Sequence, residues 1–436
     1  MTTFDKILPK LAEIFSPHSA ELQRISPVYV NRDLNGRVRL IVAEQWEEDP
    51  QARISLNAIT QAMREQLGAH AFPASQAIIF EANVESVIKY GGFAAPLADL
   101  DSVWVIDRLA TEGNWSTISP IAAGVPRVVF FSIKGGVGRS TAMAATAWSL
   151  AQSGKRVLVL DLDLESPGLS SSLLPSDRRP AYGITDWLVE DLVNNGDAVL
   201  PYMIATSALS HDGDIYVVPA HGVNPGEYIS KLGRAWMSKV AADGQRESWS
   251  QRLQRLLNTL EEKLEPDVIL IDSRAGIDEV ASACVTDLGA TLVLLFAIEG
   301  EQTWSGYRIL FQHWRTTCVV RKIRRRLQLV GAVIPELGST EYFSALRESA
   351  WTLFSEELYD EVAPGEIASG DIWSFDDSEE GAPHSPWPIR WHRSFAALRS
   401  MHSRLDEIDS HEVSNVFGEL ITGIARTVTT EDIHDD

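Results

Sequence analysis

The stretch SIKGGVGRST, residues 132–141, has the general shape of a phosphate-binding loop. Loops of the type G-x-x-x-x-G-K-[ST] bind phosphate oxygens through backbone N–H groups, and their lysine reaches the terminal phosphates. The position of that lysine here holds Arg139, which keeps the positive charge but carries it on a planar group with a longer stem. Three interpretations are open at this point: a working nucleotide site, a modified site or a relic.

The residues around this loop are those that a phosphate site requires. An apolar run at 128–133 predicts a strand before the loop, and the pattern at 140–152 predicts a helix after it. Gly135, Gly136 and Gly138 allow close approach of the backbone, and the start of the helix adds partial positive charge.

Two oxygen-bearing side chains supply a candidate metal site. Ser140 has the hydroxyl position that binds Mg²⁺ in such loops, and Asp272 ends the predicted strand 268–272, where a Walker-B carboxylate would stand. A glycine-rich loop alone would be weak evidence. The loop, the hydroxyl and the carboxylate together favour a phosphate site over a glycine turn that serves only packing.

The elements that position these residues alternate between strands and helices. Strands that are apolar on both faces and alternate with amphipathic helices are typical of a mostly parallel sheet covered on both sides, an α/β fold. Ligands of such sheets bind beyond the carboxyl ends of the strands, where the loop lies. The strands expected from residue 127 onward are 128–133, 156–160, 215–219, 268–272, 291–297 and 327–334, with helices at 140–152, 247–264, 278–288 and 302–316.

The segments KGGVGRST, GKRVLVLDLDLESPGL and VILIDSRAGI together resemble the deviant Walker-A ATPases of the ParA/MinD type, a branch of the P-loop proteins. Members of this branch dimerise around nucleotide. The resemblance covers roughly residues 127–335, and KGGVGR in place of KGGVGK resembles a recognisable variant subgroup. It implies ATP and Mg²⁺ as cofactors.

The resemblance also implies roles for individual residues. Lys134 would reach across a homodimer to the phosphates bound by the partner, and Thr141 would contact the α-phosphate. Asp163 would orient the attacking water and, with Ser140 and Asp272, belong to the metal site. The residues that would wrap or sense the phosphates are Gly135, Gly136, Val137, Gly138, Arg139, Ser140, Thr141 and Gly276.

Arg139 is the departure from the family pattern. A guanidinium cannot take the point-like place of an ammonium without moving something, so nucleotide binding is easier to defend than fast turnover. We expect Arg139 to pair with β- and γ-phosphate oxygens, and Lys134 to supply part of the missing point charge. Asp161 stays open between a functional role and the capping of the turn that follows its strand.

The division of the chain is expected at about residue 122. Residues 1–122 alternate helix-like and strand-like pieces and predict a small N-terminal α/β domain of unknown role, with 111–126 as a linker. Residues 123–436 would form the ATPase domain, with a core at 127–335 and a helical C-terminal part at 336–436.

The net charge of −22 on 436 residues argues against a protein that coats nucleic acid over its whole surface. A basic cluster, Arg321 to Arg326, is nevertheless concentrated in this acidic chain. It either binds DNA phosphates, as the resemblance allows, or solvates a helix end and pairs with the protein's own acids.

Cellular location is expected to be the cytoplasm. The two cysteines, Cys284 and Cys318, lie in no metal-binding or paired context, and the first 15 residues lack the apolar region of an export signal. The longest apolar runs are about half the ~20 residues that cross a bilayer, and the last helix lacks the basic face of a membrane binder, so no membrane partner is expected.

The leading functional hypothesis is therefore a slowly hydrolysing, Mg²⁺-dependent ATP switch that closes as a homodimer and is read by a protein partner. The subgroup resembles proteins of bacterial multi-gene systems, among them phage-defence systems. Two alternatives remain: a nucleotide-sensing scaffold without turnover, and a ParA-like ATPase that positions DNA or cargo.

Overall fold

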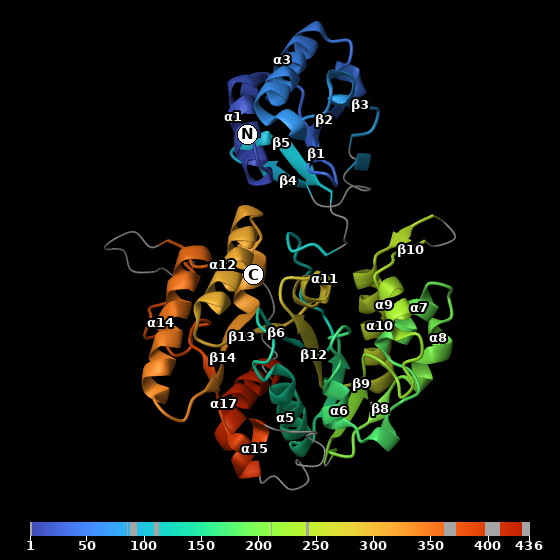
Figure 1. Ribbon diagram of the computed structural model, residues 1–436, viewed down its shortest axis with the longest axis vertical. Coiled ribbons are helices and arrows are strands. Elements are labelled where there is room, and N and C mark those ends of the chain that lie inside the picture. Colours follow the sequence, from blue (N-terminus) through green and yellow to red (C-terminus); the bar gives the residue numbers. More distant parts are fainter. Residues whose placement is uncertain are drawn as a thin grey trace. The chain divides into compact units, whose positions relative to one another are not determined.

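The computed structural model divides the chain into two compact units, Met1–Glu112 and Gly113–Asp436. Figure 1 shows their elements along the chain. The structure describes residues 2–84, 86–87, 94–108, 113–210, 212–240, 244–361, 372–396 and 410–429.

The first unit is a mixed five-stranded sheet in the order β3-β2-β1-β5-β4. The central strands β1 and β5 are parallel, whereas β2 runs antiparallel to β1. Asp49 caps the longest helix, whose first residue is the proline that this position favours. The elements are α1 (Ile7–Phe15), α2 (Ser19–Arg24), β1 (Val28–Arg32), β2 (Val38–Ala43), α3 (Pro50–Leu67), β3 (Ile78–Glu81), β4 (Ala94–Leu97) and β5 (Leu100–Asp107).

The second unit is built on an eight-stranded sheet in the order β15-β14-β13-β6-β12-β7-β9-β8. The strands are parallel except for β8, which runs antiparallel to its neighbour β9. Its strands are β6 (Arg127–Ser132), β7 (Arg156–Asp161), β8 (Ala205–Thr206), β9 (Asp214–Val218), β12 (Val268–Ala275), β13 (Leu292–Ala297), β14 (Leu327–Ile334) and β15 (Trp387–Arg390); β10 (Lys239–Val240) and β11 (Arg246–Glu247) form a separate hairpin.

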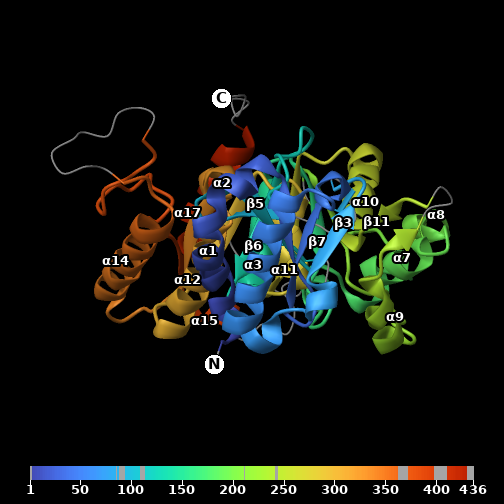
Figure 2. The same ribbon diagram turned by 90° about the horizontal axis from the view of Figure 1, so that it is seen from above.

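Helices cover both faces of this sheet, and Figure 2 shows α14 and the group α7 to α10 toward opposite ends of it. One face packs against α5 (Arg139–Gln152), α6 (Leu169–Leu173) and α17 (Ser410–Thr429). The other helices are α7 (Ile184–Asp191), α8 (Gly196–Val199), α9 (Tyr228–Ala235), α10 (Trp249–Leu264), α11 (Glu279–Ser282), α12 (Glu301–Thr316), α13 (Val320–Ile323), α14 (Ser339–Glu357) and the short α15 (Arg393–Ala396).

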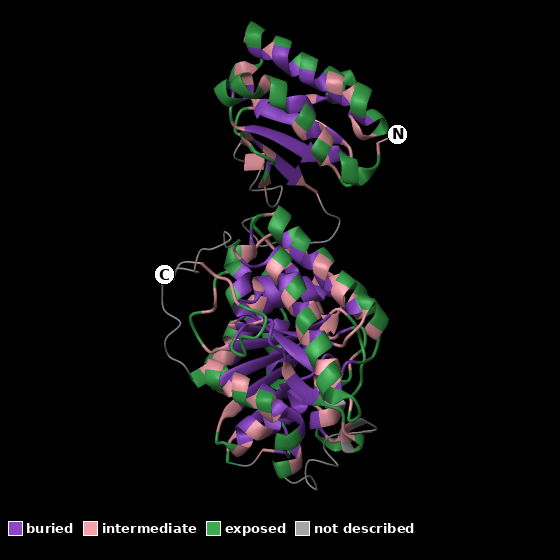
Figure 3. Ribbon diagram, turned by 90° about the vertical axis from the view of Figure 1, so that its left-hand side faces the viewer, coloured by how far each residue is buried: buried purple, intermediate pink, exposed green. Residues whose placement is uncertain are grey.

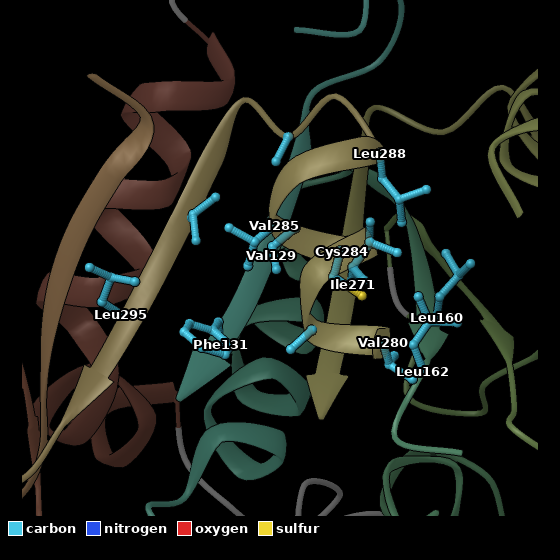
Figure 4. Close-up of a cluster of buried hydrophobic side chains, with 14 of the residues drawn as sticks. Val129, Phe131, Leu160, Leu162, Ile271, Val280, Cys284, Val285, Leu288 and Leu295 are labelled. Atoms are coloured by element: carbon cyan, nitrogen blue, oxygen red, sulfur yellow. The ribbon is translucent and has the colours of Figure 1, made fainter. Parts of the chain in front are cut away.

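The core follows the alternation of side chains along the strands. Val129 and Phe131 of β6 face the side of α10 to α12, whereas Val128 and Phe130 face α5 and α17. Figure 3 shows the strands as a buried layer, and Figure 4 shows the first of these clusters. Burial of both faces explains the continuous apolar runs of the sequence and confirms the predicted mostly parallel α/β fold.

Three local expectations differ from the structure. Residues from 113 to 126 pack on the second unit and are not a free linker, because Trp115 contributes to its core and the Ser119 amide bonds Thr286. The helix expected at 278–288 is present over residues 279–287 but differs in type, since only α11 is α-helical and Ala283–Asp287 form a π-helix. The C-terminal part is not wholly helical, since β15 extends the sheet beside β14.

Within the part of the chain that the structure describes, every helix is too short or too polar to span a bilayer.

Candidate nucleotide site

The glycine loop lies between β6 and α5, at the carboxyl end of the central strand. Strand β6 ends at Ser132, and α5 begins at Arg139 directly after Gly138. Gly136 and Gly138 have φ angles of 76° and 78°, which L side chains rarely adopt, and a Cβ at Gly135 or Gly136 would meet open space. The loop is therefore an open backbone cradle at the start of a 14-residue helix.

A cavity of about 450 Å³ opens above this cradle. It lies where ligands of parallel sheets usually bind, beyond the carboxyl ends of the strands. Its walls are Ser132, Gly135, Gly136, Val137, Gly138, Arg139, Ser140, Thr141, Asp163, Ser166, Arg274 and Ala275.

Asp272 is the buried centre of the site. Strand β12 places it opposite Asp161 of β7, and its side chain is 1% exposed. The hydroxyl of Ser140 donates to Asp272 Oδ2 at 2.6 Å, and Arg139 Nε donates to Oδ1 at 2.6 Å. The structure thus brings the predicted metal ligands Ser140 and Asp272 into direct contact.

Arg139 turns inward toward the carboxylates and is 7% exposed. Besides Asp272, its Nη1 donates to Ser132 Oγ at 2.9 Å and its Nη2 to Asp163 Oδ2 at 3.4 Å. We expected this guanidinium to pair with phosphates, so its engagement with three groups of the chain itself is a feature that the sequence did not predict.

The electrostatics of the cluster follow from its burial. Burial opposes the charge of Arg139, but the carboxylates of Asp272 and Asp163 outweigh it and raise the pKa of the guanidinium. Burial raises the pKa of Asp163 above its usual range, and the nearby Arg139 only partly offsets this. Arg139 therefore stays charged, and its positive charge lies next to the two carboxylates of Asp272 and Asp163.

Of the other predicted residues, Val137 and Thr141 line the same cavity, and Lys134 and Gly276 each adjoin a lining residue in the sequence. Lys134 is exposed, Val137 is buried, and Thr141 is half-buried on the first turn of α5. Gly276 follows β12 with φ 100°, and its amide donates to the carbonyl of Ser132 at 2.8 Å. The amide is thereby tied to the strand that leads into the glycine loop.

Arg274 is a cavity residue that the sequence did not single out. Its Nη1 lies 2.7 Å from Glu165 Oε2, and its Nε lies 3.2 Å from Asp278 Oδ2. From the end of β12 it therefore contacts both the segment that follows β7 and the residue that precedes α11. The sequence signal for Arg274 was its position between Asp272 and Gly276 in the stretch DSRAG, but the identity of its partners depends on the fold.

The donor set suits Mg²⁺ held through phosphates. Mg²⁺ prefers oxygen ligands and commonly takes one or two carboxylates together with substrate phosphates. Ser140 Oγ, Asp272 and Asp163 provide such oxygens beside the cradle. Among the described residues, no group of three or more His, Cys, Asp or Glu side chains could hold a metal by itself.

The basic cluster at 321–326 is split between surface and interior. Arg324 is buried and pairs with both carboxylate oxygens of Asp360 at 2.8 Å, and Arg326 is also buried. Arg321, Lys322 and Arg325 are exposed. Two of its cations are thus part of the protein's own packing.

Comparison with known proteins identifies the family of the chain. The model of the CobQ/CobB/MinD/ParA nucleotide binding domain family matches residues 128–364, which is more than half of the chain. The chain belongs to this family, and its ParA/MinD-like P-loop core, predicted from the sequence, is confirmed.

Curated relatives include septum site-determining proteins MinD. That of Buchnera aphidicola subsp. Acyrthosiphon pisum is 28% identical over 174 residues, 39% of this chain and 50% of that protein. That of Escherichia coli (strain K12) is 25% identical over 252 residues, 57% of this chain and 72% of that protein. The chain spans about half the length of the first of these relatives.

Solved structures are more distant. The structure of pNOB8 ParA bound to nonspecific DNA has 17% sequence identity and a TM-score of 0.44, and covers 71% of this chain and 100% of its own. The cell division ATPase MinD of Pyrococcus furiosus has 24% identity and a TM-score of 0.32, with coverage of 49% and 73%.

Proposed function

We propose that the protein is an ATP-dependent molecular switch that binds Mg²⁺ with the nucleotide, hydrolyses it slowly and dimerises around it. The observation that carries the proposal is the meeting of the glycine cradle, the Ser140 hydroxyl and the carboxylate of Asp163 around one cavity, with the buried Asp272 hydrogen-bonded to Ser140 behind the cavity wall. Membership in a nucleotide-binding family supports the same ligand class.

Each residue has a part that its position supports. The backbone of residues 135–141 would wrap the phosphates, with the start of α5 adding favourable charge. Ser140 and Asp272 would hold Mg²⁺, which when bound neutralises phosphate charge. Asp163, half-buried at the cavity wall, would orient a water molecule toward the terminal phosphate.

The dimer is supported by the exposure of one lysine. Lys134 lies at the start of the loop with its side chain in solvent, where it is free to reach phosphates bound by a second copy. Gly276 and Arg274, at the end of β12, would respond to the terminal phosphate because they line or border the same cavity. Release of that phosphate would change these contacts.

The test combines binding with turnover. Isothermal titration of the full chain with ATP and Mg²⁺ should give saturable binding. In a malachite-green phosphate assay the wild type should release phosphate slowly, and Asp163→Ala should fall to background while still binding ATP. Absence of ATP binding in the wild type would refute the switch.

A scaffold that binds ATP without turnover is the second candidate, and one observation favours it. Arg139 Nη2 donates to Asp163, the residue proposed to orient water, so the two functions compete for one carboxylate. Equal, background-level phosphate release by wild type and Asp163→Ala, with ATP binding intact, would select the scaffold.

We extend the proposal to a protein partner within a bacterial multi-gene system such as one for phage defence, which the neighbouring genes would test. DNA binding through residues 321–326 stays a prediction, with Arg321, Lys322 and Arg325 as its exposed cations. We also propose that the first unit, Met1–Glu112, is a domain of its own, which places the domain boundary before residue 113 and not at about 122.

A further inference from the structure

Arg139 occupies the centre of the carboxylate cluster from which a metal ligand set would be drawn. Its Nε and Nη2 donate to Asp272 and Asp163, and its Nη1 donates to Ser132 Oγ. All three nitrogens of the guanidinium are therefore engaged with the chain itself. A lysine ammonium would have to reach all three acceptors from a single nitrogen, whereas the guanidinium reaches each of them from a different one.

The same contacts engage both oxygen atoms of Asp272, which a cation would need. One oxygen of Asp272 accepts from Arg139 and the other from Ser140, both at 2.6 Å. A divalent ion entering here would compete with both hydrogen bonds and would stand beside a buried positive charge. The charge repulsion is strong because Arg139 is 7% exposed and water screens it little.

From this geometry we propose that Arg139 acts as an internal substitute for the divalent cation in the nucleotide-free protein. Its guanidinium compensates Asp163 and Asp272 and keeps the metal out until a polyphosphate arrives. The phosphates then supply the anions that a guanidinium prefers, and the carboxylates become free for Mg²⁺. The release of the carboxylates by nucleotide rests on the proposed function, whereas the exclusion of metal from the nucleotide-free protein does not.

This arrangement would couple metal and nucleotide entry. Free Mg²⁺ would not bind before ATP. In the nucleotide-free chain, Arg139 would neutralise the carboxylates, and the glycine cradle would stay open to phosphate. Arg139, in place of the family's lysine, would then serve the nucleotide-free state of the site and would not mark a lost function.

The test measures metal binding without nucleotide. Mn²⁺ is the probe, since it shares the oxygen preference of Mg²⁺ and its free concentration is visible by electron paramagnetic resonance. Wild type and Asp163→Asn should bind Mn²⁺ equally weakly, through the general acidic surface. The proposal would be overturned if wild type bound at least one Mn²⁺ ten times more tightly than Asp163→Asn does.

A gain-of-binding arm makes the test specific. Arg139→Met should bind one Mn²⁺ at least tenfold more tightly than wild type, and the gain should vanish in Arg139→Met/Asp163→Asn. The matched control is Arg156→Gln, which removes the same charge from an exposed ion pair with Glu265 at the other end of β7. An equal gain in this control, or none in a folded Arg139→Met, would overturn the proposal.

These results separate the two proposals. ATP titration of wild type tests the switch, and nucleotide-free Mn²⁺ titration tests Arg139. If ATP fails to bind while the Mn²⁺ pattern holds, only the proposed function is lost. If ATP binds but the Mn²⁺ pattern fails, only the role of Arg139 is lost.

Discussion

Replacing Asp272 with asparagine should destabilise the nucleotide-free second unit strongly. The substitution removes the charge that faces Arg139 Nε at 2.6 Å, where the two side chains are 8% and 1% exposed. Breaking a buried pair from one side typically costs about 3–5 kcal/mol, because the remaining charge stays buried. Asp163, 3.4 Å from Nη2, would compensate only weakly. For a unit of this size the loss corresponds to a fall in Tm of about 4–7 °C.

Differential scanning calorimetry in EDTA, without nucleotide, would measure this fall for the transition of the larger unit. The control is Glu265→Gln, which breaks an exposed pair with Arg156 and should cost less than about 0.5 kcal/mol. Asp272→Asn/Arg139→Met, which removes both charges, should lose less stability than Asp272→Asn alone. A loss below about 1 kcal/mol in Asp272→Asn, or simple additivity in the double variant, would refute the argument.

Two further predictions concern residues away from the cavity. Burial raises the pKa of the Cys284 thiol, whereas Cys318 is exposed. A thiol reagent should therefore label only Cys318 in the native protein and both cysteines in guanidinium. Labelling of both in the native state would contradict the packing of Cys284 in Figure 4. Burial lowers the pKa of His384, whose Nδ1 lies 2.6 Å from the Tyr359 hydroxyl. The fold favours neutral His384, so its contribution is complete above about pH 6.5 and is lost as the pH falls from there through the lowered pKa, at about 1.4 kcal/mol for each pH unit. Urea unfolding at pH 7.5 and pH 5 should show a smaller pH dependence for His384→Gln than for wild type, and identical dependence would refute it.

Much of the second unit was predictable because its signals are local. The strand at 327–334 and the helix at 302–316 agree with β14 and α12 to within a residue, since each is set by its own apolar pattern. The residues of the loop were found in the same way, because the positive φ of Gly136 and Gly138 is a conformation that glycine adopts without strain.

Elements that depend on distant partners were missed. Strand β15 has four residues and becomes a strand only because β14 offers it an edge. Residues from 113 to 126 carry the glycines and prolines of a linker, yet Trp115 finds a place against Phe131, 6.0 Å between ring centroids, and the segment is held on the core. Either outcome depends on a surface from a distant part of the chain, the edge of β14 or the core around Phe131, which no local sequence pattern reveals.

The sequence by itself indicated most of the strands and helices, the glycine cradle and the candidate ligands Ser140 and Asp272, because periodicity and backbone preference are properties of neighbouring residues, whereas Asp163 was inferred from the family resemblance. The tertiary structure alone decided where the guanidinium of Arg139 lies. Its partners come from β6, from β12 and from the turn after β7, which are far apart along the chain. The direction of a long charged side chain is set by the field of the charges around it, and only the folded sheet brings those charges together.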